Sequence, residues 1–219
     1  MTFQRFRRHV AVAILAAGLS ACTSFLPGSG PAPNIYDLSP KSTFDEDLPQ
    51  VRWQLIVEVP NASRGIDTDR IVIRPNAIEI LYLKGAKWSN RAPEMVQALL
   101  TESFENTGKI VGVGRRSIGL TGEFVLRTDL REFQAERVDG GAQVRVNMSF
   151  KLVHRRQGVI FASESFEVVV PAASDSTTDI VVAFDEALGR VMKRGVTWTL
   201  RKGEEHYAGM AQGTGQPVE

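Results

Sequence analysis

Three consecutive segments of alternating apolar and polar residues constrain the fold of this chain more than any other feature. In residues 123–138, EFVLRTDLREFQAERV, the side chains of Phe124, Leu126, Thr128 and Leu130 are in phase, and Phe133 then falls out of phase. That break predicts a β-bulge near Arg131 or Glu132. The two other segments, each reached by a short turn, cover residues 143–153 and 159–170. The pattern predicts an antiparallel meander with one apolar and one polar face.

Two segments change to the spacing of an amphipathic helix. Residues 90–108 carry apolar side chains on one helical stripe. Residues 174–200 repeat the pattern after a capping-box serine, Ser176, although Gly189 and Gly195 argue against an unbroken helix. We therefore expect an α+β fold in which a single antiparallel or mixed sheet packs against two amphipathic helices.

Further strands are expected around the first helix. Residues 51–59 alternate as in a half-buried strand. Residues 70–74 and 77–83 are rich in β-branched side chains and are separated by Pro75-Asn76, which predicts a hairpin. A short strand is expected near 109–113, directly after the helix.

The N-terminus has the pattern of a lipoprotein export signal. A basic head is followed by a run of about ten apolar residues, short of the ~20 that a membrane-spanning helix needs. Leu19-Ser20-Ala21-Cys22 resembles the lipobox of bacterial lipoproteins, in which the cysteine sulfur receives a diacylglycerol and the freed amine an acyl chain such as palmitate. The alternative is a buried cysteine in a core helix. The Arg7-Arg8 pair also suggests twin-arginine export, but nothing around the pair supports this beyond the doublet, and we favour the general secretory route.

The sequence predicts four parts with different roles. They are a cleaved signal peptide (1–21), a lipidated N-terminus with a flexible linker (22–34), a folded domain (35–200) and a polar disordered tail (201–219). Cleavage would remove three of the 26 basic residues and none of the 25 acidic ones, which leaves a formal charge of −2. A nearly neutral domain argues against broad nucleic-acid binding.

The residue pattern argues against catalysis and metal binding. Cys22 is the only cysteine, so it has no disulfide partner within the chain and no metal-ligand spacing. His154 is expected at a surface turn and His206 in the tail, and no G-x-S-x-G motif is present. The glycine-rich segment around Arg115 and Arg116 lacks dinucleotide and P-loop spacing, and we interpret it as a loop that can meet an acidic partner. We expect a non-enzymatic protein with no metal and no cofactor beyond the lipid on Cys22.

The segment ILYLKGAKW, residues 80–88, suggests a contact surface. Tyr82 and Trp88 flank Lys84 between the expected strand and the first helix. Tyrosine and tryptophan combine apolar bodies with polar tips, which suits a protein partner or lipid headgroups. The alternative is that Trp88 fastens the helix to the sheet. The candidate contact residues are Tyr82, Lys84, Trp88, Arg115 and Arg116.

Several motifs occur in an order that resembles the ABC-type transport auxiliary lipoprotein family. They are the lipobox ending at Cys22, YDL at 36–38, Asp69-Arg70, Tyr82, Trp88, Pro93 and AFDEALGRV at 183–191. The similarity extends over roughly residues 20–200 and is most specific in 66–108, whereas the segment GVGRRSIG departs from the family pattern. The resemblance implies a partner of an ABC transport system whose substrate-binding protein has an MCE domain and which moves phospholipid or other hydrophobic cargo.

The resemblance also implies a place in the cell envelope. Thr23 follows the cysteine instead of the aspartate that commonly retains lipoproteins in the inner membrane, which favours the periplasmic face of the outer membrane. We expect a subunit that docks the MCE-domain protein through a sheet edge or the 80–88 surface, and assembly into a homo-oligomer is compatible with this role. The alternatives are a structural outer-membrane lipoprotein of another envelope machine (lipopolysaccharide export or Tol-like) and a small-molecule binder.

Overall fold

The computed structural model describes residues 32–115 and 122–213, and these contain nine strands and two helices. The signal peptide 1–21, Cys22, Arg116 and residues 214–219 lie outside the described residues. The strands are β1 (Asn34–Tyr36), β2 (Val51–Val57), β3 (Asn61–Ala62), β4 (Arg70–Arg74), β5 (Leu81–Trp88), β6 (Ile110–Gly114), β7 (Phe124–Val138), β8 (Gly141–His154) and β9 (Val159–Pro171). The helices are α2 (Ala92–Asn106) and α3 (Thr177–Gly213). The α+β fold class is confirmed.

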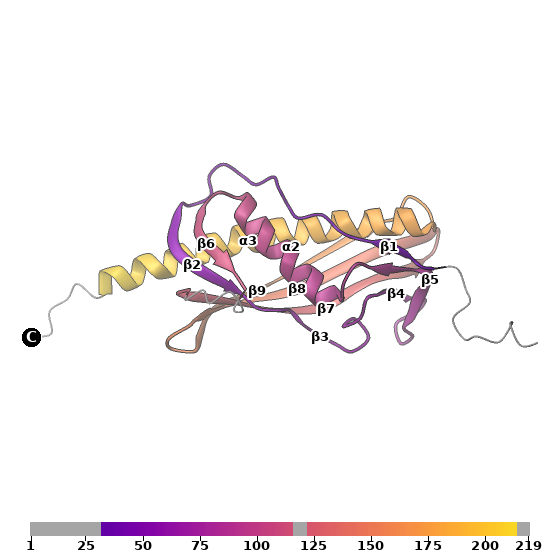
Figure 1. Ribbon diagram of the computed structural model, residues 1–219, viewed down its shortest axis with the longest axis horizontal. Coiled ribbons are helices and arrows are strands. Elements are labelled where there is room, and N and C mark those ends of the chain that lie inside the picture. Colours follow the sequence, from indigo (N-terminus) through magenta and orange to yellow (C-terminus); the bar gives the residue numbers. More distant parts are fainter. Residues whose placement is uncertain (1–31, 116–121, 214–219) are drawn as a thin grey trace, which may run out of the picture. The chain divides into compact units, whose positions relative to one another are not determined.

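Strand β7 is the centre of a mixed sheet (Figure 1). Along one edge it pairs antiparallel with β8, which pairs antiparallel with β9, so the predicted meander is confirmed. Along its other edge β2, β3 and β4 follow one another, all parallel to β7. Beyond them β6 pairs parallel with β2, β5 pairs antiparallel with β4, and β1 pairs parallel with β5. The sequence pattern did not predict these parallel pairings.

The predicted bulge in β7 is present. The register with β8 shifts between Leu130 and Glu132. Leu130 before the shift and Phe133 after it are both buried. The extra residue resets the alternation, so both halves of β7 direct apolar side chains to the same core.

The second strand of the predicted hairpin begins later than expected, at Leu81. The Asn76 side-chain oxygen accepts hydrogen bonds from the backbone N–H groups of Ile78 (3.1 Å) and Glu79 (3.0 Å). These amides therefore belong to a turn closed by a side chain and not to a strand ladder. Strand β5 then extends to Trp88, so residues 84–88 lie within the sheet and not between a strand and the helix.

Both helices pack on the same face of the sheet, and the main core lies between them and the sheet (Figure 1). The buried side chains of β8 on this face are Val144, Val146, Met148, Phe150 and Leu152. The buried side chains of α3 include Ile180, Phe184, Leu188, Val191 and Val196. Among the described residues, neither helix has both the length and the apolar character required to cross a membrane.

Helix α3 continues through residues 201–213, which corrects the expectation of a disordered tail beginning at 201. Gly203 is buried against the Trp53 ring, where an added Cβ would lie 2.4 Å from the nearest ring atom. The Trp53 indole N–H also donates a hydrogen bond to Glu204 (3.1 Å). Contact with the sheet therefore outweighs the weak helix propensity of a glycine-containing polar segment.

His206 belongs to this extension of α3 and not to a frayed tail. Its ring stacks on Phe161 of β9 with centroids 3.9 Å apart and an interplanar angle of 9°. The His154 ring lies 6.2 Å away, centroid to centroid. Burial lowers the pKa of His206, and the charge of His154 lowers it further.

Replacing His206 with phenylalanine should weaken the acid-side pH dependence of stability. Because the folded protein holds the His206 pKa below its usual 6.5, the unfolded chain binds this proton first as the pH falls. The free energy of unfolding of the wild type should therefore decrease below about pH 6.5. Phenylalanine preserves the ring stack and does not titrate. Thermal melts at about pH 7.5 and pH 5.5 test this, and equal losses in both proteins would assign the effect to other groups.

Candidate functional site

The face of the meander opposite the helices carries a ladder of charged side chains. Arg145 of β8 donates a hydrogen bond from Nε to Glu136 of β7 (2.8 Å) and pairs on its other side with Glu167 of β9. Glu136 also accepts hydrogen bonds from Gln143 (2.9 Å) and Gln134 (3.2 Å). The alternation that buries apolar residues on one face places these polar residues together on the other.

The electrostatics of this ladder keep its groups ionised. Burial alone would raise the pKa of Glu136, but hydrogen bonds from Arg145, Gln143 and Gln134 outweigh it and lower the pKa. The same contact raises the pKa of Arg145. Further along the same two strands, Lys151 donates a hydrogen bond to Asp129 (2.6 Å) and lowers the pKa of that carboxyl. The surface therefore presents fixed charges at neutral pH.

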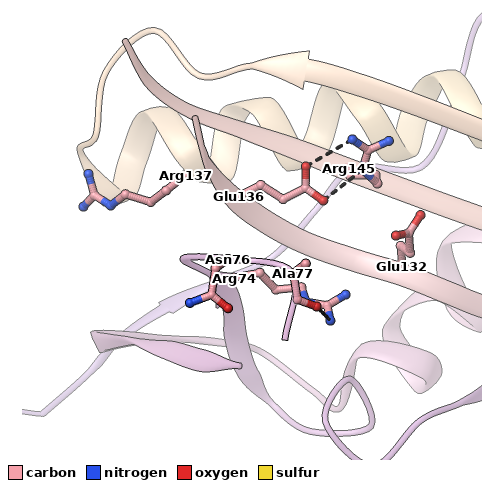
Figure 2. A pocket seen from close by; sticks show the side chains of 7 residues that line it. All are labelled: Arg74, Asn76, Ala77, Glu132, Glu136, Arg137 and Arg145. Atoms are coloured by element: carbon pink, nitrogen blue, oxygen red, sulfur yellow. Dashed lines mark hydrogen bonds and ion pairs between the residues drawn. The ribbon is translucent and has the colours of Figure 1, made fainter. Parts of the chain in front are cut away.

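A hollow of about 400 Å³ opens beside this ladder, where the β4–β5 connection approaches the end of β7. Figure 2 shows the side chains that line it: Arg74, Asn76, Ala77, Glu132, Glu136, Arg137 and Arg145. The pairing of β4 with β7, with Arg74 opposite Glu136, brings the two parts of the lining together.

Most charges of this polar hollow are compensated within the protein. Arg137 pairs with Asp175 (2.6 Å), and Arg145 pairs with two glutamates. Arg74, in contrast, donates to the carbonyl oxygen of Ala77 (2.7 Å) and forms no ion pair among the described residues. Among the described residues, the one hydrogen bond that Glu132 accepts is a long one of 3.5 Å from Gln134. The hollow therefore offers one cation and one carboxylate to a polar ligand.

The lining consists of charged and amide side chains and one alanine, which suit the binding of a polar ligand. None of its seven residues is serine, cysteine or histidine, the side chains that most often act as nucleophile or base. Among the residues that the structure describes, no three His, Cys, Asp or Glu side chains are grouped to hold a metal ion.

Trp88 is not a surface contact residue. Its side chain is 1% exposed and packs edge-on against Phe184 of α3, with centroids 5.1 Å apart. It also contacts Phe133 of β7, with centroids 5.6 Å apart. The alternative interpretation, that Trp88 fastens a helix to the sheet, describes its position, although the helix it contacts here is α3.

The other predicted contact residues do not form one site. Tyr82 is half-buried, donates a hydrogen bond to the Gly65 carbonyl (3.3 Å) and lies under the Arg70 guanidinium, 3.6 Å from the ring centroid. Lys84 is exposed on β5. Arg115 is exposed after β6 and borders a separate hollow with Glu58 and Glu94. Strands β4, β7 and β2 separate β5 from β6, so Lys84 and Arg115 lie on different parts of the sheet.

The sequence pattern did not predict the polar hollow, because the residues that line it come from segments far apart in the chain. The alternation in residues 123–138 and 143–153 does place Glu136 and Arg145 on one polar face, and this signal was available. The contribution of Arg74 depends on the parallel pairing of β4 with β7, for which no local pattern exists.

Comparison with known proteins identifies the family of this chain. Residues 36–194 match the family described as the ABC-type transport auxiliary lipoprotein component. The chain belongs to this family. The match confirms the resemblance that the order of motifs predicted. The family's description links its members to ABC transport and to lipoproteins.

The chain is also similar to proteins from two bacteria. A crystal structure of a protein from Xanthomonas campestris is 32% identical, with a TM-score of 0.75, and the match covers 80% of this chain and 99% of that one. An uncharacterized protein of Bradyrhizobium diazoefficiens is 28% identical over 192 residues, which are 85% of this chain and 49% of the relative. The auxiliary lipoprotein thus spans about half the length of that curated relative.

A further crystal structure supports the fold alone. It is of an uncharacterized protein that is 13% identical, with a TM-score of 0.57, and the match covers 75% of this chain and 96% of that one.

Proposed function

We propose that this auxiliary lipoprotein is a non-enzymatic, lipid-anchored docking subunit of an MCE-type ABC transport system at the outer membrane. The observation that carries the proposal is the succession of a lipobox-like sequence ending at Cys22, a short linker and a family domain at residues 36–194. The subunit would hold the periplasmic MCE-domain component near the membrane while phospholipid or another hydrophobic substrate passes. Any energy would come from the ATPase of the partner system.

Cys22 supplies the proposed anchor. A diacylglycerol on the sulfur and an acyl chain on the amine give more than one buried chain, which is the condition for stable membrane attachment. Thr23 at the next position is the feature that favours the outer membrane.

Two docking surfaces were expected, a sheet edge and the 80–88 segment. Because Trp88 is buried and residues 81–88 form strand β5 within the sheet, we propose docking at a sheet edge. Among the described strands, β1, β3, β6 and β9 each pair on one side only, and β1 and β3 have only three and two residues, against five in β6. Strand β9 carries the exposed carboxylates Glu164 and Glu167, which discourage pairing with another strand. Strand β6, IVGVG, has no charged residue, and its Val111 is 65% exposed. We assign partner docking to β6, by addition of a strand from the MCE component.

A photo-crosslinking amino acid at Val111 should capture an MCE-domain protein in cells. The matched control places the same amino acid at Ser163, which is exposed on the charged edge strand β9 and should capture little of that protein. Captured proteins are identified by mass spectrometry after denaturing purification. Recovery at Val111 of only lipopolysaccharide-export or Tol-like proteins would contradict the MCE assignment.

The Cys22→Ala variant serves as the anchoring control in the same cells. It should leave the domain folded but move it from the outer-membrane fraction to the soluble periplasmic fraction, because the lipid is the proposed attachment. Retention of the variant in the membrane fraction would show that another surface anchors the protein.

A further inference from the structure

The connection between β4 and β5 presents an unusual apolar surface. Within residues 76–81, which we call the hairpin tip, Ile78 is 93% exposed, Ile80 is 42% exposed and Leu81 is 48% exposed. Single exposed apolar residues are ordinary, but here three of the four residues 78–81 expose large apolar side chains at one turn. The hydrogen bonds that Asn76 accepts from the backbone of Ile78 and Glu79 hold the turn that presents them.

The N-terminal end of the domain lies at the same end of the sheet as the hairpin tip. Strand β1 runs parallel to β5, with Asn34 opposite Ala86. The chain that enters β1 therefore comes from the direction of Leu81, the first residue of β5 and the last of the hairpin tip. The distance along β5 from Ala86 to Leu81 is five residues, or about 17 Å at ~3.3 Å per residue.

The linker is long enough for the hairpin tip to reach the membrane. Cys22 and Pro33 are eleven residues apart, which gives a maximum span of about 36–40 Å for an extended chain. This exceeds the separation of about 17 Å along the strand. A lipid on Cys22 would thus hold the hairpin tip within reach of the surface into which the acyl chains insert.

The charges around the hairpin tip suit a membrane surface of mixed headgroups. Arg74 and the exposed Lys84 lie on the strands that carry it. Glu79 lies within it, and Asp139 follows Val138, which is 43% exposed at the nearby end of β7. Basic and acidic side chains around an apolar centre match zwitterionic and anionic headgroups above acyl chains.

We propose that the hairpin tip inserts into the bilayer surface and gives the domain a second membrane contact beside the lipid. This inference rests on the proposed Cys22 anchor and adds an orientation to it. The 15-residue strand β7 would lead away from the bilayer over about 45–50 Å, because its far end, near Phe124, is opposite the hairpin end. Val111 lies near that far end, since β6 and the start of β7 both pair with Leu55 of β2.

A single introduced cysteine tests the inference in the lipidated full-length protein. Cys22 is the only native cysteine and its sulfur would carry the diacylglycerol, so a cysteine at position 78 is the only free thiol for an environment-sensitive NBD fluorophore. The protein is reconstituted into vesicles of phosphatidylethanolamine and phosphatidylglycerol that contain a spin-labelled quencher lipid. The matched control is Val111→Cys, an exposed β-branched position (65%) at the other end of β7.

For Ile78→Cys we expect the NBD emission to shift to shorter wavelength and the spin-labelled lipid to quench it by at least about three-fold. The reason is that an inserted hairpin tip places the fluorophore at the boundary between headgroups and acyl chains. For Val111→Cys we expect neither change. Equal absence of quenching at both positions, with lipid on Cys22 confirmed by mass spectrometry, would overturn membrane insertion of the hairpin tip and leave the anchor intact. An unmodified Cys22 thiol would overturn the proposed anchor and, with it, the inference.

Discussion

Replacement of Trp88 with alanine should lower the free energy of unfolding by about 3–5 kcal/mol, the range for truncation of a large buried aromatic side chain. Trp88 is 1% exposed and joins three elements, since it belongs to β5 and packs against Phe133 of β7 and Phe184 of α3. Its removal would leave a cavity between the sheet and α3 that the surrounding side chains cannot fill without moving the helix.

Urea unfolding followed by circular dichroism measures this loss. Lys84→Ala, an exposed change on the same strand, is the matched control and should alter the free energy of unfolding by less than about 0.5 kcal/mol. If Trp88→Ala retained wild-type stability and lost only the crosslink from position 111, Trp88 would be a contact residue after all. The burial of the side chain argues against that outcome.

Replacement of Gly195 with leucine should destabilise the protein by about 3 kcal/mol, at the upper end of the range for overpacking a core. An added Cβ at this position would lie 2.3 Å from the Phe150 ring. That ring is fully buried and packs against Phe166, with centroids 5.6 Å apart, so its withdrawal would also displace core neighbours. The close approach of α3 to β8 therefore requires glycine here.

Gly189 in the same helix is the matched control with the opposite expected sign. Nothing lies within 4 Å of an added Cβ at Gly189, so leucine there should stabilise the protein by about 0.5–1 kcal/mol through helix propensity. Thermal or urea unfolding of the two variants compares them directly. Similar stabilities would mean that α3 does not approach Phe150 this closely, whereas partial rescue of Gly195→Leu by Phe150→Ala would confirm the contact.

Local patterns predicted the elements whose stabilising contacts are close in sequence. The alternation in residues 123–170 predicted the meander, and the out-of-phase Phe133 predicted the bulge before it, because a bulge is the way a strand resets its faces. The cap of α3 is also local: Ser176 Oγ accepts a hydrogen bond from the Asp179 backbone N–H (3.1 Å). Each of these patterns involves residues that are only a few positions apart, so the sequence alone reveals it.

The errors in prediction occurred where distant residues decide the structure. Residues 201–213 look like a polar tail, yet they are helical because Gly203 and His206 find partners on β2 and β9. The residues next to Trp88 in the sequence are typical of a contact surface, yet side chains of β7 and α3 bury Trp88. Propensity is a weak guide at such positions because burial contributes more free energy.

The candidate site divides in the same way. Glu136 and Arg145 were visible as members of a polar face, but the parallel pairing of β4 with β7 is what places Arg74 in the same hollow. The exposure of the hairpin tip likewise depends on the turn closed by Asn76, which delays β5 until Leu81.

By itself, the sequence of this protein determined the α+β class, the meander, the bulge and the order of motifs that leads to the ABC-type transport auxiliary lipoprotein family. Each depends on side chains within one turn or one strand pair, or on the linear order of residues. Only the tertiary structure decided that three parallel strands line β7, that Trp88 is buried, and that the apolar hairpin tip and the start of β1 share one end of the sheet. These features depend on which distant segments pair, and the free energy of that choice comes from burial and hydrogen bonds between them and not from any local pattern.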